Sequence, residues 1–499
     1  MTAGKRLTSV LGVAWLVVSC SQAAPPAEQT AAKAADETLP NVPHPYDGLP
    51  EGARGILGTP FTGDFDEMVK RRVIRAGVAV NRTHYFIDKG VQRGMAAEAL
   101  LLFEEDLNKK LNTGLLKVHV AFVPLPRDQL LPALVNGRVD LVAAQLTVTP
   151  EREKLVDFTT PARTNVSEIV VGHKSAPAIA TPADLSGKEV FVRRTSSYYS
   201  SLVALNEALN GQKKPPVTIK EAPEALEDDD ILEMVNAGLV PLTVVDDYQA
   251  IFWQKVFPDL RLDKAASVRT GGSLAVAVRK NNPRLRDTAS QWIKTHGFDT
   301  WFGRTMEKKY LESTRYASNA TGEAERKRLR AIVEMFRKYG DKYDMDFLLM
   351  AAQGFQESRL DQDAKSHVGA IGVMQIMPAT GKELAVGDIS QTEPNIHGGV
   401  KYMRQLIDRE FKNEPMTTLN KGLMAFAAYN AGPGRVRQLR RLTKERGLDP
   451  NVWFGNVEQI TSEKVGRETV TYVSNIYKYY IAYKLVMEQE QAAAKARGK

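Results

Sequence analysis

The sequence contains a single cysteine, Cys20, in 499 residues. A chain with one cysteine cannot form an internal disulfide, so this thiol is either free or modified. Histidine is also scarce, and none of the seven histidines has the spacing of metal ligands. No glycine-rich nucleotide loop precedes a helical pattern, and no internal repeat is present. We therefore expect neither a metal nor another cofactor.

Long hydrophobic runs are absent after the N-terminus. The apolar run at residues 11–18 follows two basic residues and is shorter than the roughly 20 residues of a membrane-spanning helix. This pattern indicates a secretory signal peptide over residues 1–19. The sequence V-V-S-C that ends at Cys20 resembles the bacterial lipobox, which implies a lipid on Cys20 and an anchor at the periplasmic face of the outer membrane. The alternative is a plain secretory signal with an incidental cysteine.

Residues 20–60 are rich in alanine and proline, and their few bulky apolar residues are isolated. Such a segment buries too little apolar surface to fold, so we expect a flexible tether. The rest of the chain is long enough for about three lobes of ~150 residues each. The net charge of +8 suits an anionic partner. For an exported protein that partner would be murein, lipid head groups or acidic glycans, and not nucleic acid.

From residue 73 to about residue 302, strand-like runs alternate with helical ones. The runs at 73–80 and 117–125 read as strands, and the amphipathic run at 96–111 between them reads as a helix. This βαβ rhythm predicts a mostly parallel sheet. We expect a two-lobed α/β module at residues 61–312, with lobe 1 at about 70–165 and 268–305 and lobe 2 at about 166–267.

The segment L-T-V-T-P-E-R-E-K-L-V-D-F-T-T-P, residues 146–161, resembles the signature of family 3 periplasmic solute-binding proteins, the amino-acid receptors of ABC importers. The resemblance implies that Arg152 clamps a ligand carboxylate bidentately, with Thr147 as a hydroxyl partner. It also implies an aspartate of the second lobe for the ligand amine, which Asp247 matches best. Ser197, at the start of a predicted helix, would add hydroxyl and backbone donors.

Two features leave the ligand of this module open. Taken alone, Arg152 also fits a surface ion pair with Glu151 or Asp157. In addition, Arg194 and Thr195 stand where the family often has a glycine, which is a departure from simple amino-acid receptors. We expect an amino acid or a small peptide as the ligand.

The chain is helical in character from residue 323 onward, after a polar, turn-rich boundary. Residues 344–358 form an amphipathic pattern in which Asp344 is the predicted N-cap and Glu357 lies at the C-terminal end. The negative end of the helix dipole and the apolar neighbours both disfavour an ionised carboxylate there. A general acid that works near neutral pH needs such an environment. The alternative for Glu357 is an exposed glutamate at a helix end.

Four motifs then follow in the order of soluble-lytic-transglycosylase-type domains, and this part of the chain resembles that family. They are E-S at 357–358, S-H-V-G-A-I-G-V-M-Q at 366–375, A-Y-N-A-G at 428–432 and E-T-V-T-Y-V at 468–473. The resemblance implies an all-helical, lysozyme-like catalytic domain, which we place at residues 323–488, before a charged tail at 489–499. The sequence departs from the usual motifs at His367, Val373 and Val470.

The resemblance also implies the chemistry. Enzymes of this family cleave the β-1,4 bond between N-acetylmuramate and N-acetylglucosamine in peptidoglycan and leave 1,6-anhydromuramoyl ends. One carboxyl group, here Glu357, acts as acid and then as base, and no water-activating base is required. The supporting residues implied by motif position are Ser366 for the N-acetyl group, Gln375, Tyr429 and Asn430 for the sugars, and Tyr472 beside Glu357. Singly, each of them also fits a hydrogen-bonded core residue.

Two other functions remain to be distinguished from this one. A lysozyme-like hydrolase would need a second acidic residue near the cleft, for which Asp361 and Asp363 are the nearby candidates. A non-catalytic receptor that binds murein would not need Glu357 or the A-Y-N-A-G set, so their presence argues against it. The sequence therefore predicts a lipid-anchored, murein-cleaving enzyme whose first module senses a ligand.

Overall fold

The computed structural model describes residues 39–40, 42, 45–47, 49–81, 83–88, 91–310 and 323–496. The predicted signal peptide, Cys20 and most of the predicted tether lie outside the described residues, as do residues 311–322 between the two modules. The predicted limits of the modules, 61–312 and 323–488, stay predictions. The predicted tail at 489–499 is helical up to residue 496.

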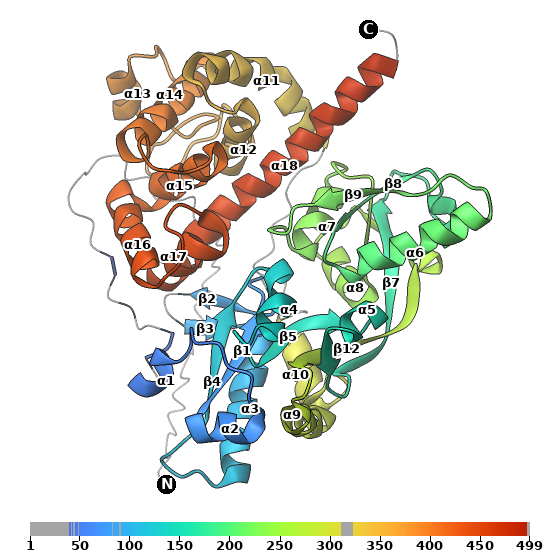
Figure 1. Ribbon diagram of the computed structural model, residues 1–499. Helices are drawn as coiled ribbons and strands as arrows, with labels where there is room; N and C mark the ends of the chain where they lie inside the picture. Colours follow the sequence, from blue (N-terminus) through green and yellow to red (C-terminus); the bar gives the residue numbers. More distant parts are fainter. Residues whose placement is uncertain are drawn as a thin grey trace, which may run out of the picture.

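The first module alternates strands and helices, as the sequence indicates (Figure 1). Lobe 1 contains α1 (Glu51–Gly55), α2 (Phe65–Arg71), β1 (Val73–Val78), β2 (Phe86–Asp88), β3 (Val91–Arg93), α3 (Met95–Leu111), β4 (His119–Pro124), α4 (Arg127–Val135), β5 (Leu141–Thr147), α5 (Pro150–Glu153) and β6 (Val156–Phe158). Lobe 2 contains η1 (Pro182–Leu185), β8 (Glu189–Arg193), α6 (Ser197–Gly211), β9 (Thr218–Ala222), α7 (Asp228–Asn236), β10 (Leu242–Asp246), α8 (Asp247–Gln254), β11 (Leu260–Asp263) and η2 (Lys264–Ala266). The long strands β7 (Arg163–His173) and β12 (Arg269–Arg279) connect the lobes, and α9 (Pro283–His296) and α10 (Trp301–Tyr310) return to lobe 1.

The main sheet is mixed, with strand order β10-β7-β12-β5-β1-β4. The predicted parallel pairing holds for β1 with β4 and with β5, and for β8 with β9. It is wrong for β7 and β12, which pair antiparallel with each other and with β10 and β5 respectively. The reason is that one strand carries the chain from lobe 1 to lobe 2 and the other carries it back, so they run in opposite directions.

The second module is helical (Figure 1). Its helices are α11 (Glu323–Tyr343), α12 (Phe347–Ser358), α13 (Pro378–Leu384), α14 (Thr392–Glu410), α15 (Thr418–Ala431), α16 (Pro433–Glu445), α17 (Glu458–Lys464) and α18 (Arg467–Ala496), with the kinked turn η3 (Trp453–Val457) before α17. The cap of α12 differs from the prediction. Asp346, and not Asp344, accepts hydrogen bonds from the Leu348 and Leu349 N–H groups.

The two modules pack against each other where α17 and α18 contact β2 of lobe 1 (Figure 1). The Ser462 hydroxyl donates to the Ile87 carbonyl (2.6 Å), and the Gln459 amide donates to the Pro124 carbonyl (3.1 Å). The Arg467 guanidinium lies 4.4 Å from the centre of the Phe86 ring. These contacts hold the catalytic module against lobe 1 of the first module. Within the described residues, no helix combines the length and apolar character needed to cross a membrane.

Candidate active site and ligand cleft

Glu357 is the penultimate residue of α12, as expected from the amphipathic pattern. The Tyr472 hydroxyl on α18 donates to Glu357 Oε1 at 2.5 Å. Burial and the Glu357 carboxylate raise the pKa of Tyr472 well above its usual value, so the phenol keeps its proton. The predicted contact between these two motif residues is thus present, and it fixes one carboxyl oxygen of Glu357.

The loop after α12 depends on a glycine. Gly372 has a φ of +79°, and a Cβ there would lie 2.3 Å from the amide nitrogen of Asn395. Asn395, which is buried, donates to the Ile371 carbonyl (2.9 Å) and accepts from the Met374 N–H (2.8 Å). The positive φ and the close approach of Asn395 both require glycine at position 372, and the part played by Asn395 had no signal in the sequence motifs.

The structure gives Gln375 and Ser366 roles within the loop. The Gln375 amide nitrogen donates to the Ala364 and Gly372 carbonyls at 3.1 and 2.9 Å. Only the amide oxygen of Gln375 could therefore contact a sugar. The Ser366 hydroxyl accepts from the Ala370 N–H (2.9 Å) and closes the turn.

Hydrogen bonds join the four sequence motifs around Glu357. The hydroxyl of Ser358, the second residue of the E-S motif, donates to the Val373 carbonyl at 2.8 Å. The Tyr429 hydroxyl donates to the Met374 carbonyl at 3.3 Å, and the Asn430 amide oxygen accepts from the Thr469 hydroxyl at 2.6 Å. Motifs that are more than a hundred residues apart in the sequence therefore meet in one site.

The two candidate second carboxylates are placed differently from Glu357. Asp361 lies in the turn after α12, where it accepts from the Asp363 N–H (3.0 Å) and lies 3.9 Å from the Arg328 guanidinium. Asp363 is exposed. Among the described residues, no cluster of three or more His, Cys, Asp or Glu side chains could hold a metal ion. Among these three carboxylates in the described part of the chain, Glu357 is the one that accepts from the buried Tyr472 hydroxyl.

A second site lies between the lobes of the first module, in a cavity of about 240 Å³. Its lining includes three predicted residues, Thr147, Arg152 and Ser197. The Arg152 guanidinium donates to the Thr147 and Thr195 carbonyls at 2.8 and 3.0 Å. Burial and the nearby Arg127 charge lower the pKa of Arg152 to about 10, so an anion beside it would be stabilised. The alternative partner Asp157 instead pairs with Lys280 (3.2 Å).

Asp246, and not the predicted Asp247, lines this cavity. Asp246 ends β10 with 2% of its surface exposed, and its Oδ1 atom has no hydrogen-bond partner among the described residues. Burial, followed by the carboxylates of Glu168 and Asp228, raises the pKa of Asp246 well above its usual value. Asp247 begins α8 and accepts from the Tyr248 N–H instead (2.8 Å). Asp246 is therefore the better candidate for a ligand amine.

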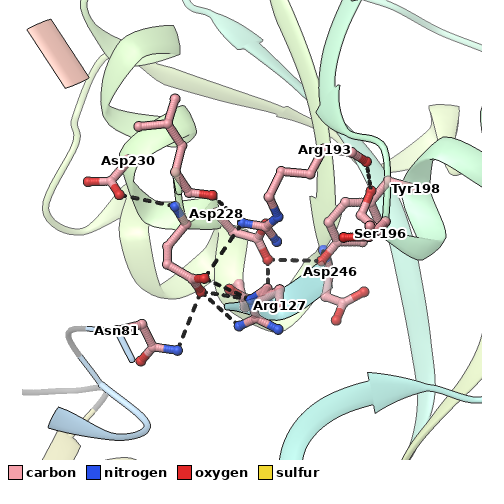
Figure 2. Close-up of polar contacts among 12 residues, drawn as sticks. Asn81, Arg127, Arg193, Ser196, Tyr198, Asp228, Asp230 and Asp246 are labelled. Atoms are coloured by element: carbon pink, nitrogen blue, oxygen red, sulfur yellow. Dashed lines mark hydrogen bonds and ion pairs between the residues drawn. The ribbon is translucent and has the colours of Figure 1, made fainter. Parts of the chain in front are cut away.

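Charged and polar side chains that sequence reasoning missed line the cleft, and two of them, Arg127 and Asn81, reach from lobe 1 to lobe 2 (Figure 2). Arg127 of α4 donates to both carboxyl oxygens of Glu227, the residue before α7, at 2.8 to 2.9 Å. Arg193 of lobe 2 donates to Asp228 at 2.6 Å. The Asn81 amide reaches the same Glu227 carboxylate at 3.5 Å. Isolated charges in the sequence carry no spacing signal that could have identified these pairs.

Residues within α7 contact the catalytic module. Lys478 of α18, with 1% of its surface exposed, donates to Glu233 at 2.5 Å and lies 3.6 Å from Asp230. The short helix α7 therefore begins at the ligand cleft, and its later residues bind α18, the helix that carries Tyr472.

Val470, one of the motif departures, lines a cavity of about 280 Å³ between the modules, together with Arg127 and Glu458. The uncharged side chain of Val470 therefore faces the cavity between the two modules. The sequence alone did not indicate this position.

Comparison with protein families also divides the chain into two modules. Residues 75–312 match the bacterial extracellular solute-binding proteins, family 3. Residues 334–451 match the transglycosylase SLT domain.

Whole-chain relatives combine both modules. The chain is 30% identical over 422 residues to the membrane-bound lytic murein transglycosylase F of Desulfosudis oleivorans, covering 80% of this chain and 87% of that protein. It is 29% identical to the protein of the same name from Ectopseudomonas mendocina, covering 79% and 81%. Among solved structures, it is similar to an ancestral amino acid-binding protein that is a precursor of cyclohexadienyl dehydratase (24% identity, TM-score 0.39, 49% of this chain and 98% of that chain).

Proposed function

The chain belongs to the family of membrane-bound lytic murein transglycosylase F, and on this premise we propose that Glu357 is the single acid and base of its reaction. The protein is accordingly a peptidoglycan lytic transglycosylase that carries a solute-binding module. The observation that supports Glu357 best is its hydrogen bond with the buried Tyr472 at the meeting point of the four motifs.

The proposed reaction uses Glu357 twice. Protonated Glu357 gives its proton to the glycosidic oxygen between N-acetylmuramate and N-acetylglucosamine, and the bond from that oxygen to the muramoyl anomeric carbon breaks. The resulting carboxylate takes the proton of the muramoyl 6-hydroxyl, whose oxygen bonds to the same anomeric carbon. The 1,6-anhydro ring closes, Glu357 is protonated again, and no water is consumed. An intramolecular nucleophile acts at high effective concentration, so a second carboxylate is not needed.

Sugar-binding roles are proposed for the residues around Glu357. Tyr429 and Asn430 border the loop that Ser358 and Gln375 hold in place. Because the Gln375 amide nitrogen is occupied within the loop, we assign its oxygen to the sugar. The Ser366 hydroxyl, which accepts one hydrogen bond, keeps its own proton for an N-acetyl carbonyl.

Replacement of Glu357 by Gln tests the proposal. The amide keeps the shape of the side chain but cannot donate and recover a proton, so cleavage of purified sacculi should fall by several orders of magnitude. Sacculus binding and the thermal unfolding midpoint should be unchanged. Turnover within tenfold of the parent protein would place the acid elsewhere.

Product mass separates this function from lysozyme-like hydrolysis. Mass spectrometry of the released muropeptides should show anhydromuramoyl ends, which are one water lighter than hydrolysis products. A predominance of reducing muramoyl ends would favour the hydrolase and a base such as Asp361.

For the first module we propose an amino acid or short peptide, such as a murein stem peptide, as the ligand. Its carboxylate would bind Arg152, with Thr147 and Ser197 beside it, and its amine would bind Asp246. A desolvated guanidinium and an unpartnered carboxyl in one cavity suit the carboxylate and the amine of a zwitterion, because a bound ammonium group would favour the ionised form of Asp246 against its raised pKa.

Titration calorimetry with a murein tripeptide tests this assignment. Arg152→Ala and Asp246→Asn should each weaken binding at least tenfold, because each leaves one ligand charge without its partner. Asp247→Asn is the matched control and should change the affinity less than twofold. If Asp247→Asn is the damaging change, the amine binds at the start of α8 instead.

We further propose that the ligand regulates cleavage through α7. Supporting this, Glu227 at the start of α7 pairs with Arg127 in the cleft, and Asp230 and Glu233 within α7 hold Lys478 of α18. A ligand that changes the closure of the lobes would shift α7 against α18, and α18 carries Tyr472.

Finally, we propose that Cys20 is lipidated and anchors the protein at the periplasmic face of the outer membrane. The lipobox-like V-V-S-C sequence supports this, as does the serine at position 21, where an aspartate would signal retention at the inner membrane. The Cys20→Ala protein should be soluble in the periplasm or remain unprocessed. Unchanged membrane association after fractionation would require a different anchor.

A further inference from the structure

A buried amide lies one helical turn before Glu357 on α12. Gln353 has none of its surface exposed, and neither its amide nitrogen nor its amide oxygen has a hydrogen-bond partner among the described residues. Residues four positions apart share one face of a helix, so Gln353 and Glu357 project from the same side of α12. A buried, unpaired amide costs about 1–3 kcal/mol, which an apolar side chain at this position would avoid.

Helix α12 packs against α18, the helix that carries Tyr472, and the Tyr472 hydroxyl bonds Glu357 one turn beyond Gln353. Although no hydrogen bond of normal geometry joins Gln353 to Tyr472, the Gln353 amide lowers the pKa of Tyr472, against the larger raising effects of burial and of Glu357. A phenol has one hydrogen, which Tyr472 gives to Glu357. The lone pairs of the phenol oxygen therefore remain for a donor, and the Gln353 N–H is a donor without another partner.

We propose that Gln353 is a positioning residue of the cleavage reaction, whose amide N–H donates to the Tyr472 oxygen and so directs the phenol hydrogen to Glu357 Oε1. Hydrogen bonds of this kind are often long in a free enzyme and tighten when substrate binds. The proposal rests on the proposed role of Glu357 as the acid.

The consequence for catalysis is a fixed acid proton. When protonated Glu357 accepts the Tyr472 hydrogen on Oε1, its own proton resides on Oε2, the oxygen that Tyr472 does not occupy. Without Gln353 the Tyr472 hydroxyl can rotate away, and the acid proton is then shared between both oxygens. The reactive arrangement becomes rarer, which lowers kcat without changing how the sugar is bound.

Stability and activity should move in different directions if this is correct. An apolar replacement of similar shape removes an unpaired polar group from the core, so Gln353→Met and Gln353→Leu should leave the thermal unfolding midpoint unchanged or raise it. Both variants of the full chain should nevertheless lose about 10- to 100-fold in kcat on soluble glycan strands, with KM within twofold. The same change at an exposed helical position, Gln405→Met, is the control and should alter neither quantity.

A double-mutant cycle with Tyr472 makes the test specific. If Gln353 acts through the Tyr472 hydroxyl, Gln353→Met should cause no further loss of kcat in the Tyr472→Phe background. A full additional loss in that background would overturn the proposal, and so would a kcat within twofold of the parent for both single variants. Neither result would affect the assignment of Glu357, which fails only if Glu357→Gln remains active.

Discussion

Glu458 lies at the junction of the modules, and burial there shifts the pKa of its carboxyl group. Its carboxyl group lines the cavity between them and accepts from the Gly455 N–H at 3.0 Å. Burial raises its pKa from 4.5 to about 7, although the hydrogen bond from Gly455 acts in the opposite direction. Arg127, Asp128, Glu224 and Glu227 line the same cavity from the first module.

This shift predicts a pH dependence of stability. Because the folded state holds the proton more tightly than the unfolded chain, the stabilising contribution is complete below pH 4.5. It is lost as the pH rises through about 7. The thermal unfolding midpoint of the catalytic module should therefore decrease as the pH rises from 5 to 8. Glu458→Gln should make this decrease smaller. Glu468→Gln, at an exposed position of α18, should leave the curve unchanged. Parallel curves for the parent and the Glu458 variant would contradict the assignment.

At the residue scale, sequence reasoning was strongest where a motif fixes one position. Glu357 and Tyr472 were predicted to lie together, and they do. Two adjacent aspartates carry no such information, because which of them faces the cleft depends on where β10 ends and α8 begins. Asp246 was missed for that reason.

At the scale of an element, helix α12 also shows what could be predicted from the sequence and what could not. Its apolar face and its end at Ser358 follow from the 3.6-residue period, but its cap lies two residues later than predicted. Asp344 takes a left-handed conformation (φ +51°) that turns the chain after α11, and Asp346 becomes the cap. Asp346 also accepts from the Tyr480 hydroxyl of α18 at 2.9 Å.

Replacement of Asp346 by Ala should therefore lower the free energy of unfolding by about 1–2 kcal/mol, since it removes the cap of α12 and the bond to α18. Urea denaturation measures the change. Asp344→Asn keeps a residue that tolerates left-handed backbone and should change the free energy by less than about 0.5 kcal/mol. The reverse order of the two effects would restore Asp344 as the cap.

In the whole molecule, the buried Lys478 links the two modules. Its ion pairs with Glu233 and Asp230 are the contacts through which α7 would act on α18. Coupling between two sites typically amounts to about 1–3 kcal/mol, or roughly 5- to 150-fold. A regulator that works through α7 should depend on this lysine.

We therefore expect Lys478→Met to reduce the effect of a murein tripeptide on the cleavage rate to less than twofold, while calorimetry shows tripeptide affinity within twofold of the parent. The variant leaves Glu233 buried without its cation, so it should also be less stable, and Glu233→Gln in the same chain should restore part of that loss. Lys484→Met, at an exposed position of α18, is the control. A tripeptide effect that survives in Lys478→Met would show that α7 is not the link.

The sequence by itself determined the two-module order, the α/β and helical classes and the position of Glu357 at a helix end, because periodicity and motif spacing are properties of neighbouring residues. The tertiary structure decided which distant charges meet. The pairs Arg127–Glu227 and Lys478–Glu233 join residues 100 and 245 positions apart, and α12 brings the unpaired amide of Gln353 to the helix of Tyr472 only because it packs on α18. Such contacts depend on how elements pack, and packing couples positions that local sequence patterns do not relate to each other.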